Sequence, residues 1–147
     1  MRLSEHFSLA EMTASSTAAR LGLRNVPNEA AIEAMRQLCA HVLEPVRAHF
    51  GRPVTINSGY RSQAVNKAVK GAASSQHVKG EAGDFEVPGV ANGDVARWIE
   101  RNLKFDQLIL EAYTPGHPSS GWVHCSWKPY GRRQSVLTFV PGQGYFN

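Results

Sequence analysis

The sequence predicts an α+β fold in which helices pack on a small, largely antiparallel sheet. Helical periodicity dominates the early part of the 147-residue chain, where apolar residues recur every three to four positions between Asn28 and Phe50. Short apolar and β-branched runs gather in the later part, separated by segments that contain Pro, Gly and Ser. Helices grouped early and strands grouped late are typical of α+β proteins.

The first predicted element is a short helix from Ser8 to Ala14. Ser8 and Glu11 form a capping-box pattern, in which each side chain binds the main-chain N–H of the other residue. The small and polar residues 13–24 favour turns, and we expect this segment to be a loop.

The strongest predicted helix begins after Asn28 and ends at Gly51, because asparagine is a good N-cap and glycine is a frequent helix terminator. Pro45 should kink or split this helix, since proline lacks an N–H and clashes with the preceding turn. We expect His41 and His49 to pack or to face solvent rather than to bind metal. The positions with the spacing of a buried face are Ile32, Met35, Leu38, Cys39, Val42, Leu43, Val46 and Phe50.

Two strands and a short helix are predicted in the middle of the chain. Val54–Ser58 carries the β-branched alternation of a strand, and Asp84–Val87 is expected to be another strand. Between them, Ser62–Lys70 is expected to form a helix that is capped by its first residue and buries Val65 and Val69.

A last helix and three strands complete the expected fold. The helix is capped by Asn92 or Asp94, and its inward positions are Val95, Trp98, Ile99 and Leu103. The three strands are Phe105–Tyr113, Trp122–Trp127 and Val136–Val140.

The composition indicates one globular domain over residues 1–147, with 42% hydrophobic and 19% charged residues. No apolar run approaches the ~20 residues of a transmembrane helix, and the first residues lack a long apolar stretch. We therefore expect no membrane span, no signal peptide and synthesis in a bacterial cytoplasm. The net charge of +4 favours an anionic polymer as partner. No Lys/Arg run is interleaved with aromatic residues, so nucleic acid is not the expected partner.

The two cysteines, Cys39 and Cys125, do not form a CxxC pair. Cys39 falls near the apolar face of the long helix, and Cys125 lies within a predicted strand. We expect both to be buried free thiols rather than a disulfide.

The chemistry of the sequence centres on residues 75–85. This segment contains His77 and Asp84, and His124 follows in a later strand. Two imidazoles and one carboxylate are a ligand set for one catalytic zinc ion, whose fourth position is left for water. In a straight strand, His77 and Asp84 would lie on opposite faces, so a turn at Gly80 must bring them to one ion.

The same segment carries a longer signature, Ser-x-His-x-x-Gly-x-Ala-x-Asp, which a Trp-x-His motif follows downstream. This pattern resembles the zinc D-alanyl-D-alanine carboxypeptidase family of peptidoglycan peptidases. The likeness also covers residues 56–62 and 105–109, and in outline it spans nearly the whole chain. It implies a small sheet with zinc on one face. The fixed positions are Ser75, His77, Gly80, Ala82 and Asp84.

A metallopeptidase also needs a general base. Several relatives carry that carboxylate three residues before the last zinc histidine, where this chain has Gly121. Glu111 is our candidate, because a carboxylate at the end of a Leu-Ile-Leu strand is partly desolvated and should have a raised pKa. Asp106 and Glu86 are the alternatives.

The resemblance also implies roles for other residues. Arg61, in a Tyr-Arg pair, matches an arginine that steadies the scissile carbonyl and its oxyanion in the related dipeptidases. Tyr60, Ser75 and Trp122 are candidate substrate-binding residues, although Ser75 could instead orient His77 and Trp122 could simply pack.

The expected function is a monomeric zinc peptidase that cuts the peptidoglycan stem, either as a D-Ala-D-Ala carboxypeptidase or as an L-Ala-D-Glu endopeptidase. The small size, the basic charge and the expected lack of a signal suggest a phage or prophage endolysin that a holin releases to the cell wall. The alternative is a non-catalytic, zinc-binding member of the same fold that acts as a wall-binding or phage structural protein.

Overall fold

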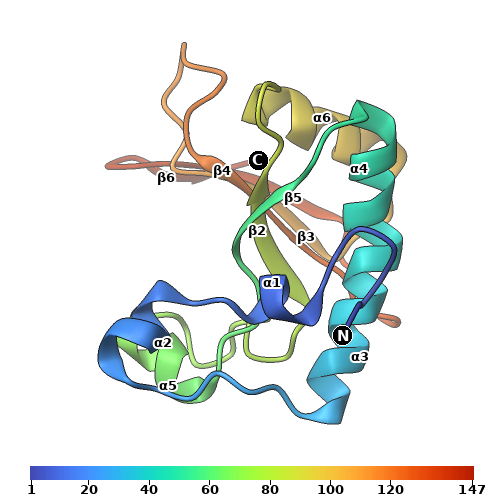
Figure 1. Ribbon diagram of the computed structural model, residues 1–147. Coiled ribbons are helices and arrows are strands. Elements are labelled where there is room, and N and C mark those ends of the chain that lie inside the picture. The colour runs from blue at the N-terminus through green and yellow to red at the C-terminus, as the bar shows by residue number, and fades with distance from the viewer.

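A six-stranded sheet forms the centre of the computed structural model, which describes residues 1–147 (Figure 1). The strand order is β1-β2-β4-β3-β5-β6. All neighbouring strands are antiparallel except β3 and β5, which are parallel. The strands are β1 (Thr55–Ser58), β2 (Ala82–Glu86), β3 (Gln107–Glu111), β4 (Trp122–Ser126), β5 (Ser135–Val140) and β6 (Gly144–Phe146).

The larger helices cover one face of this sheet, which confirms the α+β fold with a largely antiparallel sheet (Figure 1). Two smaller helices, α2 and α5, lie together away from α3 and α4 (Figure 1). The helical elements are α1 (Leu9–Thr13), α2 (Ser16–Leu21), α3 (Glu29–Leu38), the π-helical turn η1 (Cys39–Leu43), α4 (Glu44–Phe50), α5 (Gln63–Ala68) and α6 (Asn92–Asn102).

The long early helix begins and ends as the sequence predicts, but it is divided in the middle. The Asn28 side chain accepts a hydrogen bond from the N–H of Ala31, and Gly51 ends α4 in the left-handed conformation. Before Pro45 the chain widens into η1, where the N–H of Glu44 donates to the carbonyl of Cys39. A wider turn accommodates the proline ring and its missing N–H, so the expected disruption takes the form of a π-turn.

Alternation along the strands gives the sheet two different faces. Phe85, Val123 and Cys125 are fully buried and belong to the core that the helices cover. Their neighbours Asp84 and His124 point to the other face, because successive side chains of a strand alternate. The other large buried side chains of the core include Phe7, Met12, Met35, Leu38, Leu43, Ile99, Phe105 and Leu108.

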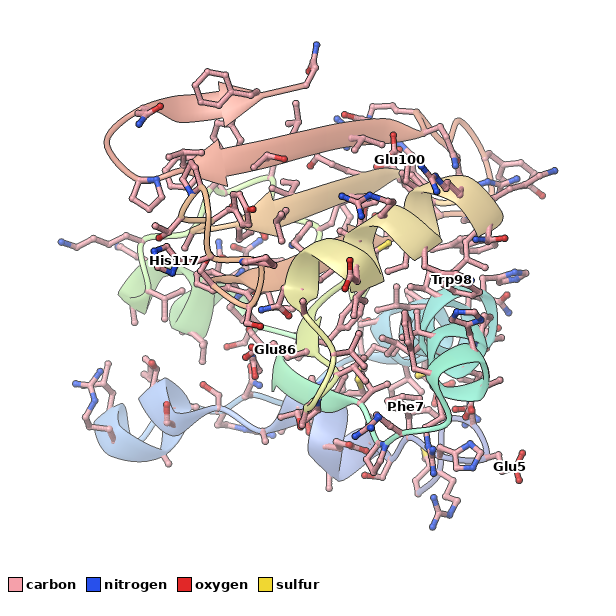
Figure 2. All side chains as sticks on the ribbon, turned by 90° about the horizontal axis from the view of Figure 1, so that it is seen from above. Glu5, Phe7, Glu86, Trp98, Glu100 and His117 are labelled. Atoms are coloured by element: carbon pink, nitrogen blue, oxygen red, sulfur yellow. The ribbon has the colours of Figure 1, made fainter.

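Two histidines of the long early helix stack on tryptophan rings. The rings of His49 and Trp98 are stacked with centroids 4.4 Å apart, and this contact joins α4 to α6. Figure 2 labels Trp98 on α6. His41 stacks in the same way on Trp127, at 4.0 Å. Both helix histidines are therefore packed on aromatic rings, as the sequence predicts, and neither belongs to the group that could hold a metal.

Two elements differ from the sequence prediction. Residues 13–24, expected to be a loop, contain helix α2. The Ser15 side chain caps this helix by accepting a hydrogen bond from the N–H of Ala18, and Gly22 ends it in the left-handed conformation. The serines of this segment thus cap a helix rather than only forming turns. The chain also continues beyond β5 into a hairpin strand, β6, after a turn in which Gly142 and Gly144 both have positive φ.

Two side chains are also placed differently from the prediction. Neither Asn92 nor Asp94 caps α6, because the helix begins at Asn92 and its N-cap position is Ala91. The amide nitrogen of Asn92 lies 2.9–3.2 Å from the carbonyls of residues 119–121. It therefore holds the loop before β4. Val69 is 40% exposed because α5 ends at Ala68, one residue before it.

Both cysteines are buried and free, as expected. Burial raises the pKa of the Cys39 thiol to about 12 and also raises that of Cys125, so both remain protonated at neutral pH. None of the helices has the length and apolar character required to cross a membrane.

Candidate metal centre

Three side chains converge on the sheet face that the larger helices leave uncovered. His77, Asp84 and His124 each offer one ligand atom, and these atoms all lie within 4.8 Å of one another. Nδ1 of His124 is 2.9 Å from Oδ1 of Asp84, and Nε2 of His77 is 3.4 Å from the same oxygen. The geometry therefore brings together the three residues that the sequence pattern singles out.

Strand register places two of these residues side by side. Asp84 on β2 is the direct antiparallel partner of His124 on β4, so their side chains share one face. His77 reaches the same face from the loop before β2, through the turn that the sequence predicts at Gly80. Gly80 has a φ of +77°, and a Cβ there would overlap the carbonyl oxygen of Ala31 on α3. Only glycine satisfies both conditions.

The imidazole of His77 is held in one orientation. Its side chain is only 3% exposed, and Nδ1 lies 2.7 Å from the carbonyl oxygen of Gly59. When Nδ1 donates a hydrogen bond to this carbonyl, the lone pair of Nε2 is free to coordinate a metal ion. Histidines that bind metals commonly donate their other ring N–H to an acceptor of this kind, which fixes the tautomer. The main-chain N–H of His77 also donates to Oγ of Ser75 at 3.2 Å, so Ser75 orients this loop.

Asp84 is ionised in this setting. Burial by itself raises the pKa of a carboxyl group, but the hydrogen bond from His124 and the nearby imidazole of His77 lower the pKa of Asp84 well below its usual range. Two imidazole nitrogens and one ionised carboxylate suit a borderline divalent ion such as zinc. The residues present thus fit a metal, with each side chain supplying one atom.

A cleft surrounds this group, and it contains several of the other residues that the sequence singles out. Arg61, Ser75, Glu111 and Trp122 all line it. Tyr60 does not; its ring packs partly buried against the hydrophobic core. The full lining is Arg61, Gly71, Ala72, Ser74, Ser75, Gln76, His77, Asp84, Gln107, Ile109, Glu111, Trp122, His124 and Tyr145.

Glu111 is the acidic residue of the cleft outside the metal group. It ends β3 opposite Trp122, two positions along the strand pair from the paired residues Ile109 and His124. Partial burial raises the pKa of its carboxyl group; the charge of His124 lowers it, and the negative charge of Asp84 adds to the rise. A carboxylate with a raised pKa is suited to accept a proton near neutral pH.

The two alternative bases have other contacts. Asp106 is fully buried and accepts hydrogen bonds from Arg133, with Oδ2 2.8 Å from Nη2. Glu86, which Figure 2 labels, lies two positions after Asp84 on β2 and accepts hydrogen bonds from the amides of Asn57 and Asn92. Neither Asp106 nor Glu86 lines the cleft around the group that could hold a metal.

Two buried donors of the cleft have no acceptor within the protein. They are Nε of Arg61 and Nε1 of Trp122. Partial burial also lowers the pKa of Arg61, although the charge of Asp84 opposes this. Buried polar atoms without partners are uncommon in folded proteins, and at a cleft they mark places where a ligand can supply an acceptor.

Sequence reasoning missed Gln76, Gln107, Ile109 and Tyr145 as members of the cleft. Gln107 and Ile109 share the face of Glu111 by strand alternation, which the predicted strand already implied. Tyr145 lies on the unforeseen strand β6. The Pro-Gly turn before it, followed by Gly144-Tyr145-Phe146, is a hairpin signal that could have revealed it.

The sheet face thus carries two histidines and one carboxylate that could hold a metal ion, with a further glutamate in the same cleft. Comparison with protein-family models assigns the chain more narrowly: the model described as Peptidase M15 matches residues 5–126, and the chain belongs to this peptidase family. The matched region contains the metal group, Arg61 and Glu111, and it ends before β5. None of the curated proteins matches the sequence of this chain.

Proposed function

We propose that this protein is a zinc-dependent peptidase that hydrolyses a peptide bond in the stem peptide of peptidoglycan. The observation that carries the proposal is the convergence of His77, Asp84 and His124 in one cleft with Glu111, in a chain that belongs to the Peptidase M15 family. The net charge of +4 supports the choice of an anionic cell-wall polymer as the substrate.

The metal group would hold a single zinc ion through His77, Asp84 and His124. When it is bound, zinc supplies Lewis-acid chemistry that activates water and polarises a carbonyl at neutral pH. The Gly59 carbonyl fixes the His77 ring, and the antiparallel register fixes Asp84 beside His124. The site is therefore preorganised by main-chain contacts.

Glu111 acts as the general base in this proposal and later returns the proton to the leaving amine. Its partial burial and its position on the same sheet face support that role. Arg61 binds the carbonyl oxygen as negative charge develops on it; a fixed guanidinium can stabilise such charge by about 3 kcal/mol. Ser75 acts through the loop that carries His77, and Trp122 offers its indole N–H to the substrate.

Two reactions fit this arrangement: removal of the terminal D-Ala by a carboxypeptidase, and cleavage between L-Ala and D-Glu by an endopeptidase. We favour a role as a monomeric phage or prophage endolysin that is made in the bacterial cytoplasm and acts on the wall after release by a holin. We infer this role by analogy, from the small size and the basic charge of the chain.

The proposal is tested on purified peptidoglycan from several wall types, incubated with the protein with and without a chelator. Mass spectrometry of the fragments identifies the bond: free D-alanine indicates a carboxypeptidase, and new N-terminal D-Glu indicates an endopeptidase. Glu111→Gln should abolish release while metal content, measured by elemental analysis, is unchanged. Activity that survives the chelator contradicts the metal-dependent mechanism. Absence of cleavage on every wall, with metal still bound, would instead favour a non-catalytic wall-binding or phage structural protein.

A further inference from the structure

A row of four side chains crosses the sheet beside the metal group. Trp122 pairs with Glu111 across β4 and β3, and Phe139 pairs with Tyr145 across β5 and β6. The parallel pairing of Leu110 with Thr138 places the next residues, Glu111 and Phe139, side by side. Side chains at paired positions share a face, so Trp122, Glu111, Phe139 and Tyr145 form one continuous row.

This row lies on the same face as the proposed metal ligands. In the adjacent row, Ile109 pairs with His124 on one side and with Leu137 on the other. Glu111 follows Ile109 by two positions and therefore points in the same direction. Tyr145 accordingly extends the cleft beyond Glu111, on the side away from β2.

Tyr145 is available to a ligand. It is 57% exposed, yet its ring packs on Phe139 with centroids 4.7 Å apart, which restricts its orientation. It lines the cleft together with Arg61, Glu111 and Trp122. Partial burial and the charge of Glu111 raise the pKa of its hydroxyl group, so the hydroxyl keeps its proton at neutral pH and can donate a hydrogen bond.

The hydrogen-bonding character of the cleft indicates what Tyr145 could bind. Arg61 and Trp122 each present a donor without a partner in the protein, and the Tyr145 hydroxyl adds a third donor in the same cleft. These three donors are complementary to a ligand that is rich in hydrogen-bond acceptors. An extended peptide with main-chain carbonyls and free carboxylates has this chemistry.

We propose that Tyr145 is a substrate-binding residue: its hydroxyl donates a hydrogen bond to a carbonyl or carboxylate of the stem peptide on the Glu111 side of the cleft. This inference rests on the proposed function for the identity of the peptide. Tyr145 lies outside residues 5–126, which the family model covers, so membership of the family does not assign it a role.

The structure provides a matched control on the same short strand. Phe146 is the next residue of β6, is 47% exposed and points to the opposite face of the sheet. Phe146→Ala removes a comparable aromatic ring from the same edge strand without touching the cleft. If the aromatic side chains of β6 only stabilised the fold, Tyr145→Ala and Phe146→Ala would change ligand binding to the same extent.

The first measurement is equilibrium binding of a synthetic stem pentapeptide, L-Ala-D-Glu-L-Lys-D-Ala-D-Ala, to the zinc-loaded protein. The Glu111→Gln background prevents turnover, and calorimetry gives the Kd. We expect Tyr145→Ala to weaken binding about 10-fold or more and Tyr145→Phe to weaken it roughly 2–10-fold, the loss expected for one hydrogen bond. Phe146→Ala should bind as the background protein does. Thermal denaturation confirms that each variant is folded.

Two results would overturn the inference: equal Kd values for Tyr145→Ala and Phe146→Ala, or no pentapeptide binding by the protein with Tyr145 intact. A second measurement separates this failure from that of the proposed function. If the protein does not cleave peptidoglycan but pentapeptide binding depends on Tyr145, the inference stands and the peptidase proposal fails. If cleavage depends on Glu111 and Tyr145→Ala leaves both KM and Kd unchanged, only the inference fails.

Discussion

The backbone of Gly121 lies directly against the main-chain carbonyl of Glu111. Gly121 has a φ of +70°, and a Cβ at this position would overlap the Glu111 carbonyl oxygen. Position 121 therefore cannot accept any side chain while the end of β3 stays where it is. This contact explains in physical terms why the position three residues before His124 has no carboxylate, and Glu111 remains the acidic residue of the cleft outside the metal group.

Substitution of Gly121 by alanine should destabilise the protein strongly. The left-handed conformation alone costs a non-glycine residue about 1 kcal/mol or more, and the overlap with Glu111 adds a similar or larger amount. We expect a loss of about 3 kcal/mol in the free energy of unfolding, measured by urea denaturation. Gly116 is the control, because it has a φ of +85° in the same loop with nothing within 4 Å of its Cβ direction. Gly116→Ala should lose only about 1 kcal/mol, and equal losses would contradict the close contact.

Removal of any one proposed ligand should prevent tight metal binding. His77→Ala, Asp84→Ala and His124→Ala each leave two ligands. We expect the affinity for zinc to fall at least ~100-fold, since loss of a group that merely orients a metal ligand can cost roughly 10–100-fold. Titration with a competing chromophoric chelator measures the affinity. His117→Ala is the control, because His117 lies in the exposed loop before β4 and outside the metal group (Figure 2). A comparable loss in this variant would argue against the proposed ligand set.

The sequence predicts the metal group because its members are chemically distinctive and closely spaced. His77, Gly80 and Asp84 lie in one short segment, so local turn chemistry is sufficient to infer their convergence. The strands that carry Asp84 and His124 show clear alternation, which fixes the face of each side chain. The helix from Asn28 is equally visible, because its apolar positions recur over many turns.

Other features depend on contacts between distant segments and could not be predicted in this way. The pairing of β3 with β5 in parallel and the place of Tyr145 follow from the packing of the whole sheet. The π-turn before Pro45 is one of several ways to accommodate a proline, and the sequence does not select among them. The obstruction at Gly121 depends on the carbonyl of a residue in another strand.

Asn25 links the N-terminal segment to the loop that carries Arg61. Its amide nitrogen donates to the carbonyls of Thr13 and Tyr60, and its oxygen accepts from the N–H of Ser62 at 2.7 Å. The N–H of Arg61 in turn donates to the carbonyl of His77. Asn25 therefore positions both main-chain neighbours of Arg61.

Asn25→Ala should lower both stability and activity. We expect a loss of about 1–3 kcal/mol in unfolding free energy, because partly buried groups lose their partners, and a fall in kcat of roughly 10-fold as Arg61 becomes less well oriented. Asn28→Ala is a matched control: its side chain caps α3, and its loss should cost about 1 kcal/mol with little change in kcat. A similar fall in kcat for both variants would attribute the effect to general destabilisation.

Arg61→Lys tests whether the guanidinium has a role beyond its charge. Lysine keeps the positive charge but lacks the planar fork and the Nε donor, which is buried and without a partner in the protein. We expect kcat on peptidoglycan to fall roughly 10–100-fold with zinc affinity unchanged. Arg97→Lys is the control, because Arg97 is 61% exposed on α6 and its contact with Asp94 is a surface pair. Full activity of Arg61→Lys would mean that charge alone is required.

The ion pair between Asp106 and Arg133 should contribute pH-dependent stability. Both Asp106 oxygens accept hydrogen bonds from Arg133, and Nζ of Lys128 is 3.7 Å from Oδ1. Burial by itself raises the pKa of this carboxyl group, but the hydrogen bonds and charges of Arg133 and Lys128 outweigh it and lower the pKa to about 2. The folded protein therefore binds the proton of Asp106 less readily than the unfolded chain does.

A lowered pKa in the folded state stabilises the protein at pH values above the ordinary pKa of aspartate. The shift corresponds to about 2 kcal/mol at neutral pH, and this contribution is lost as the pH falls from about 4 toward 2. Asp106→Asn should consequently reduce the free energy of unfolding by about 2 kcal/mol at pH 7 and by roughly half of that at pH 3. Urea denaturation at the two pH values measures the difference. Asp94→Asn, which removes only an exposed partner of Arg97, should change stability by less than about 0.5 kcal/mol at either pH. If the Asp106→Asn deficit were the same at pH 3 as at pH 7, ionised Asp106 would not be the source of the stabilisation.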